Sequence, residues 1–94
     1  MGGQSGRSLR QMLEAPPNAF YVWITGQLKY PRELALFAKR PDLVVVSPDW
    51  IEAESFRGFN PTAIVIDHHL REEGWSDKFA TSLRIARMRG AIVT

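Results

Sequence analysis

A glycine-rich stretch at residues 2–8 is the first part of the sequence whose residue types suit chemistry. It is Gly-Gly-Gln-Ser-Gly-Arg-Ser, and it runs directly into a segment with helical spacing. Glycines let a backbone curl so that several N–H groups point inward, and a helix N-terminus adds about half a positive charge. The stretch therefore predicts an anion cradle whose candidate phosphate-binding residues are Gly3, Ser5, Gly6, Arg7 and Ser8. The alternative is a loose start whose serines only cap an ordinary helix.

An aspartate at the end of an apolar stretch is the second candidate. Residues 63–66 are Ala-Ile-Val-Ile, and Asp67 follows them. A carboxylate at the carboxyl end of a buried strand lies where open α/β sheets bind ligands, so Asp67 is a candidate to hold a metal ion or orient its water. The alternative is a polar residue that caps the following turn. His68 and His69 come next, but neighbours in an extended chain point to opposite faces, so we do not expect them to share one ion.

Two further groups of side chains suggest contacts with other molecules. Arg84, Arg87 and Arg89 form a basic edge on the last predicted helix, which would suit nucleic acid but is also typical of a solvated face. Trp50 and Trp75 lie beside predicted loops, and exposed aromatic residues are frequent at protein interfaces. They are the candidate interface residues.

The elements that must position these residues alternate between helix and strand. Apolar spacing and proline positions predict helices over residues 8–15, 31–40, 47–55 and 76–90, and strands over residues 19–24, 43–46, 62–66 and 91–93. Ser47 and Ser76 are predicted N-caps of the last two helices. Residues 43–46 and 63–66 are continuously apolar, as in strands covered on both faces. The expected fold is α/β: a mostly parallel sheet of three to four strands flanked by helices.

Length and composition limit the number of domains, the kinds of partner and the location that can be expected. Ninety-four residues with 45% hydrophobic and 23% charged side chains predict one globular domain over residues 1–94, with residues 1–7 flexible or in a loop. Twelve basic against ten acidic residues give a charge of +2, too small for strong nonspecific attraction to nucleic acid. The absence of cysteine excludes thiolate catalysis and cysteine zinc sites. No stretch is apolar enough for a membrane span or a secretion signal, so no membrane partner and a cytoplasmic location are expected.

The order of these motifs resembles that of the P-loop nucleotide hydrolases, and more narrowly the first core domain of helicases and phage terminases. Residues 6–8 are similar to the end of the phosphate-binding motif, and residues 64–69 to the strand that carries the metal-binding aspartate. Residues 21–24 and 43–46 are similar to further strands of such a domain. The resemblance implies a three-layer arrangement, a nucleotide with Mg²⁺ as ligand, and an origin in a phage.

The sequence departs from the family at several places that matter for hydrolysis. Arg7 stands where the family has lysine, Met1 falls at its first glycine, and His68 replaces its usual glutamate. No strand is predicted ahead of the glycine-rich stretch, where the family has its central strand. Phosphoryl transfer needs positioning, metal and charge stabilisation together, so efficient hydrolysis is not expected.

Two functions follow from the sequence. The first is a small, phage-encoded, non-catalytic interaction module that binds a host protein or itself in the host cytoplasm. The alternative is a phosphate- or nucleotide-binding protein with weak or absent hydrolysis, which uses the glycine-rich stretch and Asp67. Adjacent histidines and the lack of a nucleophile-elbow serine exclude a serine–histidine–acid triad from the prediction.

Overall fold

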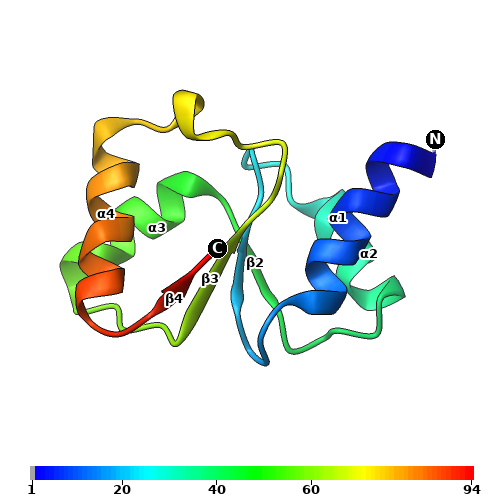
Figure 1. Cartoon of the computed structure of the whole chain (residues 1–94), viewed down its shortest axis with the longest axis horizontal. Helices are drawn as coiled ribbons and strands as arrows, with labels where there is room; N and C mark the ends of the chain where they lie inside the picture. The colour runs from blue at the N-terminus through cyan, green and yellow to red at the C-terminus, as the bar shows by residue number, and fades with distance from the viewer. Residues whose placement is uncertain (1) are drawn as a thin grey trace.

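A computed structural model describes residues 2–94, and their side chains apart from those of residues 2–5 and 56. Helices and strands alternate along the chain (Figure 1). The elements are α1 (Gly2–Glu14), β1 (Phe20–Val22), α2 (Lys29–Phe37), β2 (Val44–Val46), α3 (Pro48–Glu54), η1 (Ser55–Arg57), β3 (Ala63–Ile66), η2 (Glu72–Gly74), α4 (Asp77–Met88) and β4 (Ile92–Val93), where η marks a 3₁₀ helix.

The strands form one parallel sheet in the order β2-β1-β3-β4. Helices α1 and α2 lie against one face, and α3 and α4 against the other (Figure 1). The predicted α/β class with a parallel, helix-covered sheet is therefore confirmed, with four strands. No helix in the described part of the chain is long and apolar enough to cross a membrane.

Each face of the sheet has its own apolar core, because successive strand residues point to opposite faces. Tyr21 of β1 packs in the core beneath α1 and α2, whereas its neighbour Val22 packs in the core beneath α3 and α4. All four residues of β3 are buried, as the apolar sequence predicts. The central strands β1 and β3 thus serve both cores.

The start of the chain differs from the predicted loop. Residues 2–7 belong to α1 instead of preceding it, and Met1 lies outside the described residues. A glycine at position 6 is compatible with this, since the helix exposes it and no atom lies within 4 Å of the position where a Cβ would be. The apolar stripe of the helix begins at Leu9, which packs against the core beneath α1 and α2, whereas Gly6 and Arg7 are exposed.

Candidate metal and phosphate site

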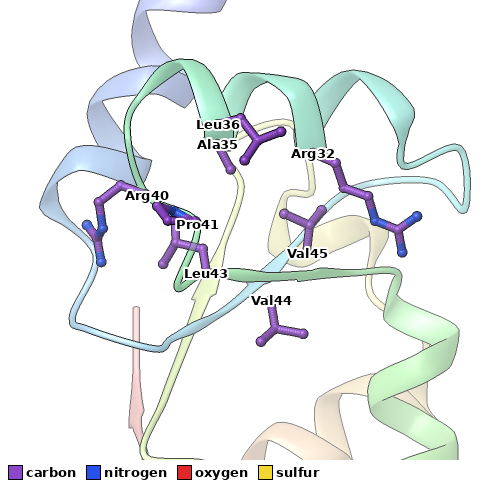
Figure 2. Close-up of a pocket in the computed structure, with 8 residues that line it drawn as sticks. All are labelled: Arg32, Ala35, Leu36, Arg40, Pro41, Leu43, Val44 and Val45. Carbon is purple, nitrogen blue, oxygen red and sulfur yellow. The ribbon is translucent and has the colours of Figure 1, made fainter.

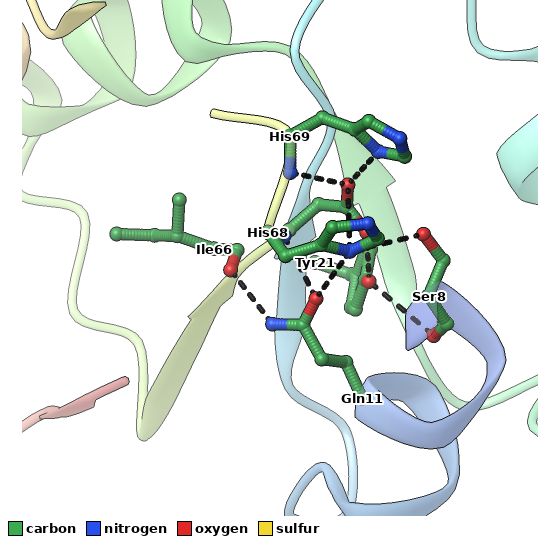
Figure 3. Close-up of polar contacts among 7 residues, drawn as sticks. Ser8, Gln11, Tyr21, Ile66, His68 and His69 are labelled. Carbon is green, nitrogen blue, oxygen red and sulfur yellow. Dashed lines mark hydrogen bonds and ion pairs between the residues drawn. The ribbon is translucent and has the colours of Figure 1, made fainter. Parts of the chain in front are cut away.

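The carboxyl ends of β1 and β3 meet at one edge of the sheet. Val22 pairs with Ile66, and the N–H of Asp67 donates to the Val22 carbonyl at 3.0 Å. Asp67 is therefore held in line with β3, and it is completely buried. Figure 3 shows Ser8 and Gln11 of α1 reaching toward this edge from the side.

The carboxylate of Asp67 is surrounded by donors. The Tyr21 hydroxyl donates to Oδ1, while the backbone N–H of His69 at 3.1 Å and its Nδ1 at 2.6 Å donate to Oδ2. Burial alone would raise the pKa of Asp67, but hydrogen bonds from Tyr21, His69 and Ser8 outweigh burial and hold the pKa below its ordinary value. Burial, and then the Asp67 carboxylate, raises the pKa of Tyr21 far above its ordinary value. At neutral pH the aspartate is ionised and the tyrosine is neutral.

Ser8 lies next to Asp67. Its side chain is almost fully buried, and its hydroxyl helps to lower the pKa of Asp67. The Ser8 Oγ is 3.5 Å from Nδ1 of His68, and the Ser8 carbonyl is 3.4 Å from the Tyr21 hydroxyl. Helix α1 therefore places Ser8 beside Asp67, even though residues 2–7 are helical and form no loop.

Gln11 is a site residue that the sequence interpretation missed. Its Oε1 accepts a hydrogen bond from the backbone N–H of His68 at 2.7 Å, and its Nε2 donates to the Ile66 carbonyl at 2.9 Å. Residues three apart share a face of a helix, so the spacing from Ser8 is the signal that could have found it. Tyr21 was also missed, because an aromatic residue in a strand is more often plain core.

The expectation that the side chains of His68 and His69 point to opposite faces is wrong, so the sequence-based argument against a shared ion does not hold. Both residues lie in a turn after β3 and not in extended chain, and their ring centroids are 4.0 Å apart. Nδ1 of His68 faces Gln11 Oε1 at 3.2 Å, and Nδ1 of His69 faces the Asp67 carboxylate at 2.6 Å. An ion held by both Asp67 and His69 would take the place of the proton that otherwise lies between them.

His68 is favoured in its neutral form. Burial is the main cause that lowers the pKa of His68 below its ordinary value. Electrostatic repulsion from the neighbouring His69 and from Arg7 acts in the same direction, against the opposing effect of Asp67. Neutral imidazole is the form that binds metals. Arg7 is exposed on α1, and its effect on the pKa of His68 indicates that its charge lies near the carboxyl end of β3.

One ligand atom from each of Asp67, His68 and His69 lies within 4.8 Å of the other two. A carboxylate with two imidazoles is a donor set that suits Zn²⁺, Mn²⁺ or another transition-metal ion. Mg²⁺, which the family resemblance implies, prefers oxygen ligands and fits less well, because two of the three donors are nitrogens.

The arrangement does not form a nucleophilic triad. Ser8 Oγ at 3.5 Å and Asp67 Oδ2 at 3.7 Å both face Nδ1 of His68. In a triad the serine and the acid must contact opposite nitrogens of the ring, so that a proton can be taken on one side while the other side is oriented.

The remaining predicted site residues divide into those near this edge and those far from it. Gly3 and Ser5 lie in α1, but their side chains are outside the described part of the structure. Arg84 and Arg87 are exposed on α4, on the opposite face of the sheet from α1 (Figure 1). Arg89 follows that helix and donates to the Phe59 carbonyl at 2.9 Å.

Trp50 and Trp75 are both half-buried against the core beneath α3 and α4. The Trp50 ring stacks on Phe20 with 5.4 Å between centroids, and Trp75 packs edge-on against Phe79 at 5.6 Å. Their predicted interface role stays a prediction. No family model, curated protein or solved structure matches this chain.

Proposed function

We propose that the protein binds a divalent transition-metal ion through Asp67, His68 and His69, and a phosphate-bearing ligand through that ion. The observation that carries this proposal is the convergence of one carboxylate and two imidazoles within 4.8 Å at the carboxyl end of β3. The pKa of Asp67 and that of His68 are both lowered, which gives the ionised carboxylate and the neutral ring that a metal needs at neutral pH.

The phosphate ligand follows from the open coordination positions and from a neighbouring cation. Three protein ligands leave room for a further ligand, and a bound ion neutralises charge on phosphate oxygens as a Lewis acid. Arg7 stands close enough to lower the pKa of His68, and a guanidinium pairs with phosphate oxygens through two parallel hydrogen bonds. The contact between Ser8 and Asp67 supports the same ligand class, which the family resemblance also implies.

Metal binding is tested by calorimetry on tag-free protein with Zn²⁺, Mn²⁺ and Mg²⁺. We expect one ion per chain and tighter binding of Zn²⁺ and Mn²⁺ than of Mg²⁺. His69→Asn should lose more than about 100-fold in affinity, because losing even an outer-shell partner of a ligand costs about tenfold to 100-fold. The control is Glu72→Gln, which removes an exposed carboxylate a few residues further along. Equal affinity in the parent and in His69→Asn would refute the site.

Phosphate binding is tested separately with inorganic phosphate, ADP and ATP, each with and without Mn²⁺. We expect binding that requires the metal and that weakens in Arg7→Gln, because the guanidinium contributes a second positive charge. Arg84→Gln removes an equally exposed arginine from the far face and should have no effect. Metal binding without any phosphate binding would reject the ligand class and leave the metal site intact.

The other function expected from the sequence is that of an interaction module. Its support lies away from the metal site, at the surface of α2 and β2. Trp50 and Trp75 are already packed in the core beneath α3 and α4. The most exposed apolar side chains on α2 and β2 lie instead beside the outer edge of the sheet.

A further inference from the structure

The outer edge of β2 is an unpaired strand edge. This strand is the last one on its side of the sheet, so only β1 pairs with it in the described part of the chain. The N–H of Val44 donates to Ala19 at 3.0 Å and the carbonyl of Val46 accepts from Trp23 at 2.8 Å, so both residues bond inward. Val45 alternates with them, and its N–H and C=O therefore point away from the sheet.

An apolar groove of about 340 Å³ runs beside this edge, between β2 and α2. Figure 2 shows Leu36 and Arg32 of α2 on one side of the strand and Val44 on the other. Leu36 is 65% exposed, Phe37 75% and Val44 42%. Apolar side chains thus flank the open edge on both faces of the sheet.

Natural sheets protect such edges with short strands, charged residues, proline or a bulge. Strand β2 is Val-Val-Val and carries no charged residue, proline or bulge, so its short length is the one such feature within the strand. The opposite edge strand, β4, has only two residues. The outer edge of β2 therefore offers the longer and more apolar surface for strand addition.

We propose that β2 pairs with β2 of a second copy of this chain, antiparallel and across a two-fold axis at Val45, so that two four-stranded sheets become one. In an antiparallel pair, residues opposite each other can exchange both backbone hydrogen bonds, and a two-fold axis places Val45 opposite its own copy. Val44 and Leu36 of each copy then cover the junction from the two faces of the joined sheet.

The charges beside the groove distinguish antiparallel from parallel pairing of two copies. Arg32 lies toward the C-terminal end of β2, and Arg40 toward its N-terminal end (Figure 2). Arg40 is already paired with Asp42 at 3.0 Å. Antiparallel pairing places Arg32 of each copy near the Arg40–Asp42 pair of the other, in which the Asp42 carboxylate offsets the charge of Arg40. Parallel pairing would instead place Arg32 against its own copy, with like charges facing each other.

The mass in solution tests this proposal, measured by sedimentation equilibrium from micromolar to near-millimolar protein. We expect the 10.7 kDa chain to reach twice its mass, and Leu36→Lys or Val44→Lys to raise the dissociation constant about tenfold or more, since lysine blocks strand edges. Met88→Lys makes the same change at a residue that is 80% exposed on α4 and should leave the constant unchanged. A chain that stays monomeric throughout this range overturns the proposal.

Amide hydrogen exchange distinguishes this dimer from one formed elsewhere. The Val45 amide should exchange fast in dilute protein and slowly at concentrations where the dimer forms, whereas the outward amide of Val93 on β4 should stay fast at both. Leu36→Lys should abolish the protection of Val45. A dimer in which Val45 remains unprotected overturns the proposal as surely as a monomer does.

Discussion

At the scale of single residues, the site depends on how a fully buried carboxylate is kept charged. An ionised group without partners is costly in the interior of a protein. Asp67 avoids this cost because Tyr21 and His69 donate to its two oxygens. No buried side-chain nitrogen or oxygen among the described residues lacks a hydrogen-bond partner. The ionised form of Asp67 thus depends on the groups that donate to it. Removing one of these donors should change the free energy of unfolding.

Tyr21→Phe removes the hydroxyl that donates to Asp67 and leaves the ring in place. We expect the free energy of unfolding to fall by about 1–3 kcal/mol, the cost of an unsatisfied buried partner. The pKa of Tyr21 is raised from 10.0, so its contribution to stability is complete below pH 10 and is lost as the pH rises further. Urea unfolding between pH 7 and pH 11, in protein and variant, measures both effects. The same alkaline loss in Tyr21→Phe would contradict this assignment.

The influence of Arg7 on His68 gives a second prediction at this scale. A nearby positive charge disfavours the imidazolium form, so Arg7→Gln should raise the pKa of His68. Arg84→Gln, on the far face of the sheet, should leave it unchanged. Titration of the ring protons by NMR measures both. An unchanged pKa in Arg7→Gln would remove Arg7 from the site, and with it the second cation of the proposed phosphate site.

At the scale of elements, two helices begin with serine caps. Ser47 Oγ accepts from the Trp50 N–H at 3.3 Å, and Ser76 Oγ accepts from the Phe79 N–H at 3.0 Å. Both caps were predicted from the sequence, because the donor and acceptor are three residues apart. The contact between Gln11 and His68 joins residues 57 apart, and no local pattern specifies which helix face meets which strand end.

The cap at Ser76 should have a measurable effect on stability. Ser76→Ala leaves the Phe79 N–H without its acceptor and also removes a hydrogen bond to Glu52 at 2.8 Å. We expect a loss of about 1 kcal/mol in the free energy of unfolding. Thr81→Ala removes a hydroxyl from an exposed position within the same helix and should be neutral or slightly stabilising, since alanine favours helices. Equal losses in the two variants would mean that the cap contributes nothing.

A second tie between elements comes from one arginine. Arg40 follows α2 and donates to the carbonyls of Met12 at 2.7 Å and Pro16 at 3.2 Å, at the end of α1 and just beyond it. It also pairs with Asp42 before β2. A guanidinium at the C-terminus of a helix satisfies carbonyls that have no partner within the helix. Through these contacts Arg40 links the end of α1, the end of α2 and the start of β2.

At the scale of the whole molecule, the alternation of apolar strands with helices was enough to predict a parallel sheet covered on both faces. The sequence did not predict the strand order β2-β1-β3-β4. That order depends on which helix packs on which strand, and each strand here is equally apolar. It also could not predict the approach of His68 to His69, because that depends on where the chain turns after β3.

The shared central strands lead to a last prediction about cooperativity. Trp23 packs against the core beneath α1 and α2, while Trp50 and Trp75 pack against the core beneath α3 and α4. Because β1 and β3 contribute to both cores, loss of one core should remove the support of the other. Fluorescence of Trp23→Phe and of the double variant Trp50→Phe/Trp75→Phe should therefore give coincident denaturation midpoints when each is compared with circular dichroism.

A core substitution on one face sharpens this test. Met12→Ala empties part of the core beneath α1 and α2 and should cost about 2–5 kcal/mol. Added to either tryptophan background, it should lower the midpoint seen from both faces by the same amount, although Met12 contacts only one of the two cores. If the tryptophans beneath α3 and α4 kept their original midpoint, the two faces would unfold independently. The sheet would then be a mere partition between two cores and not the element that joins them.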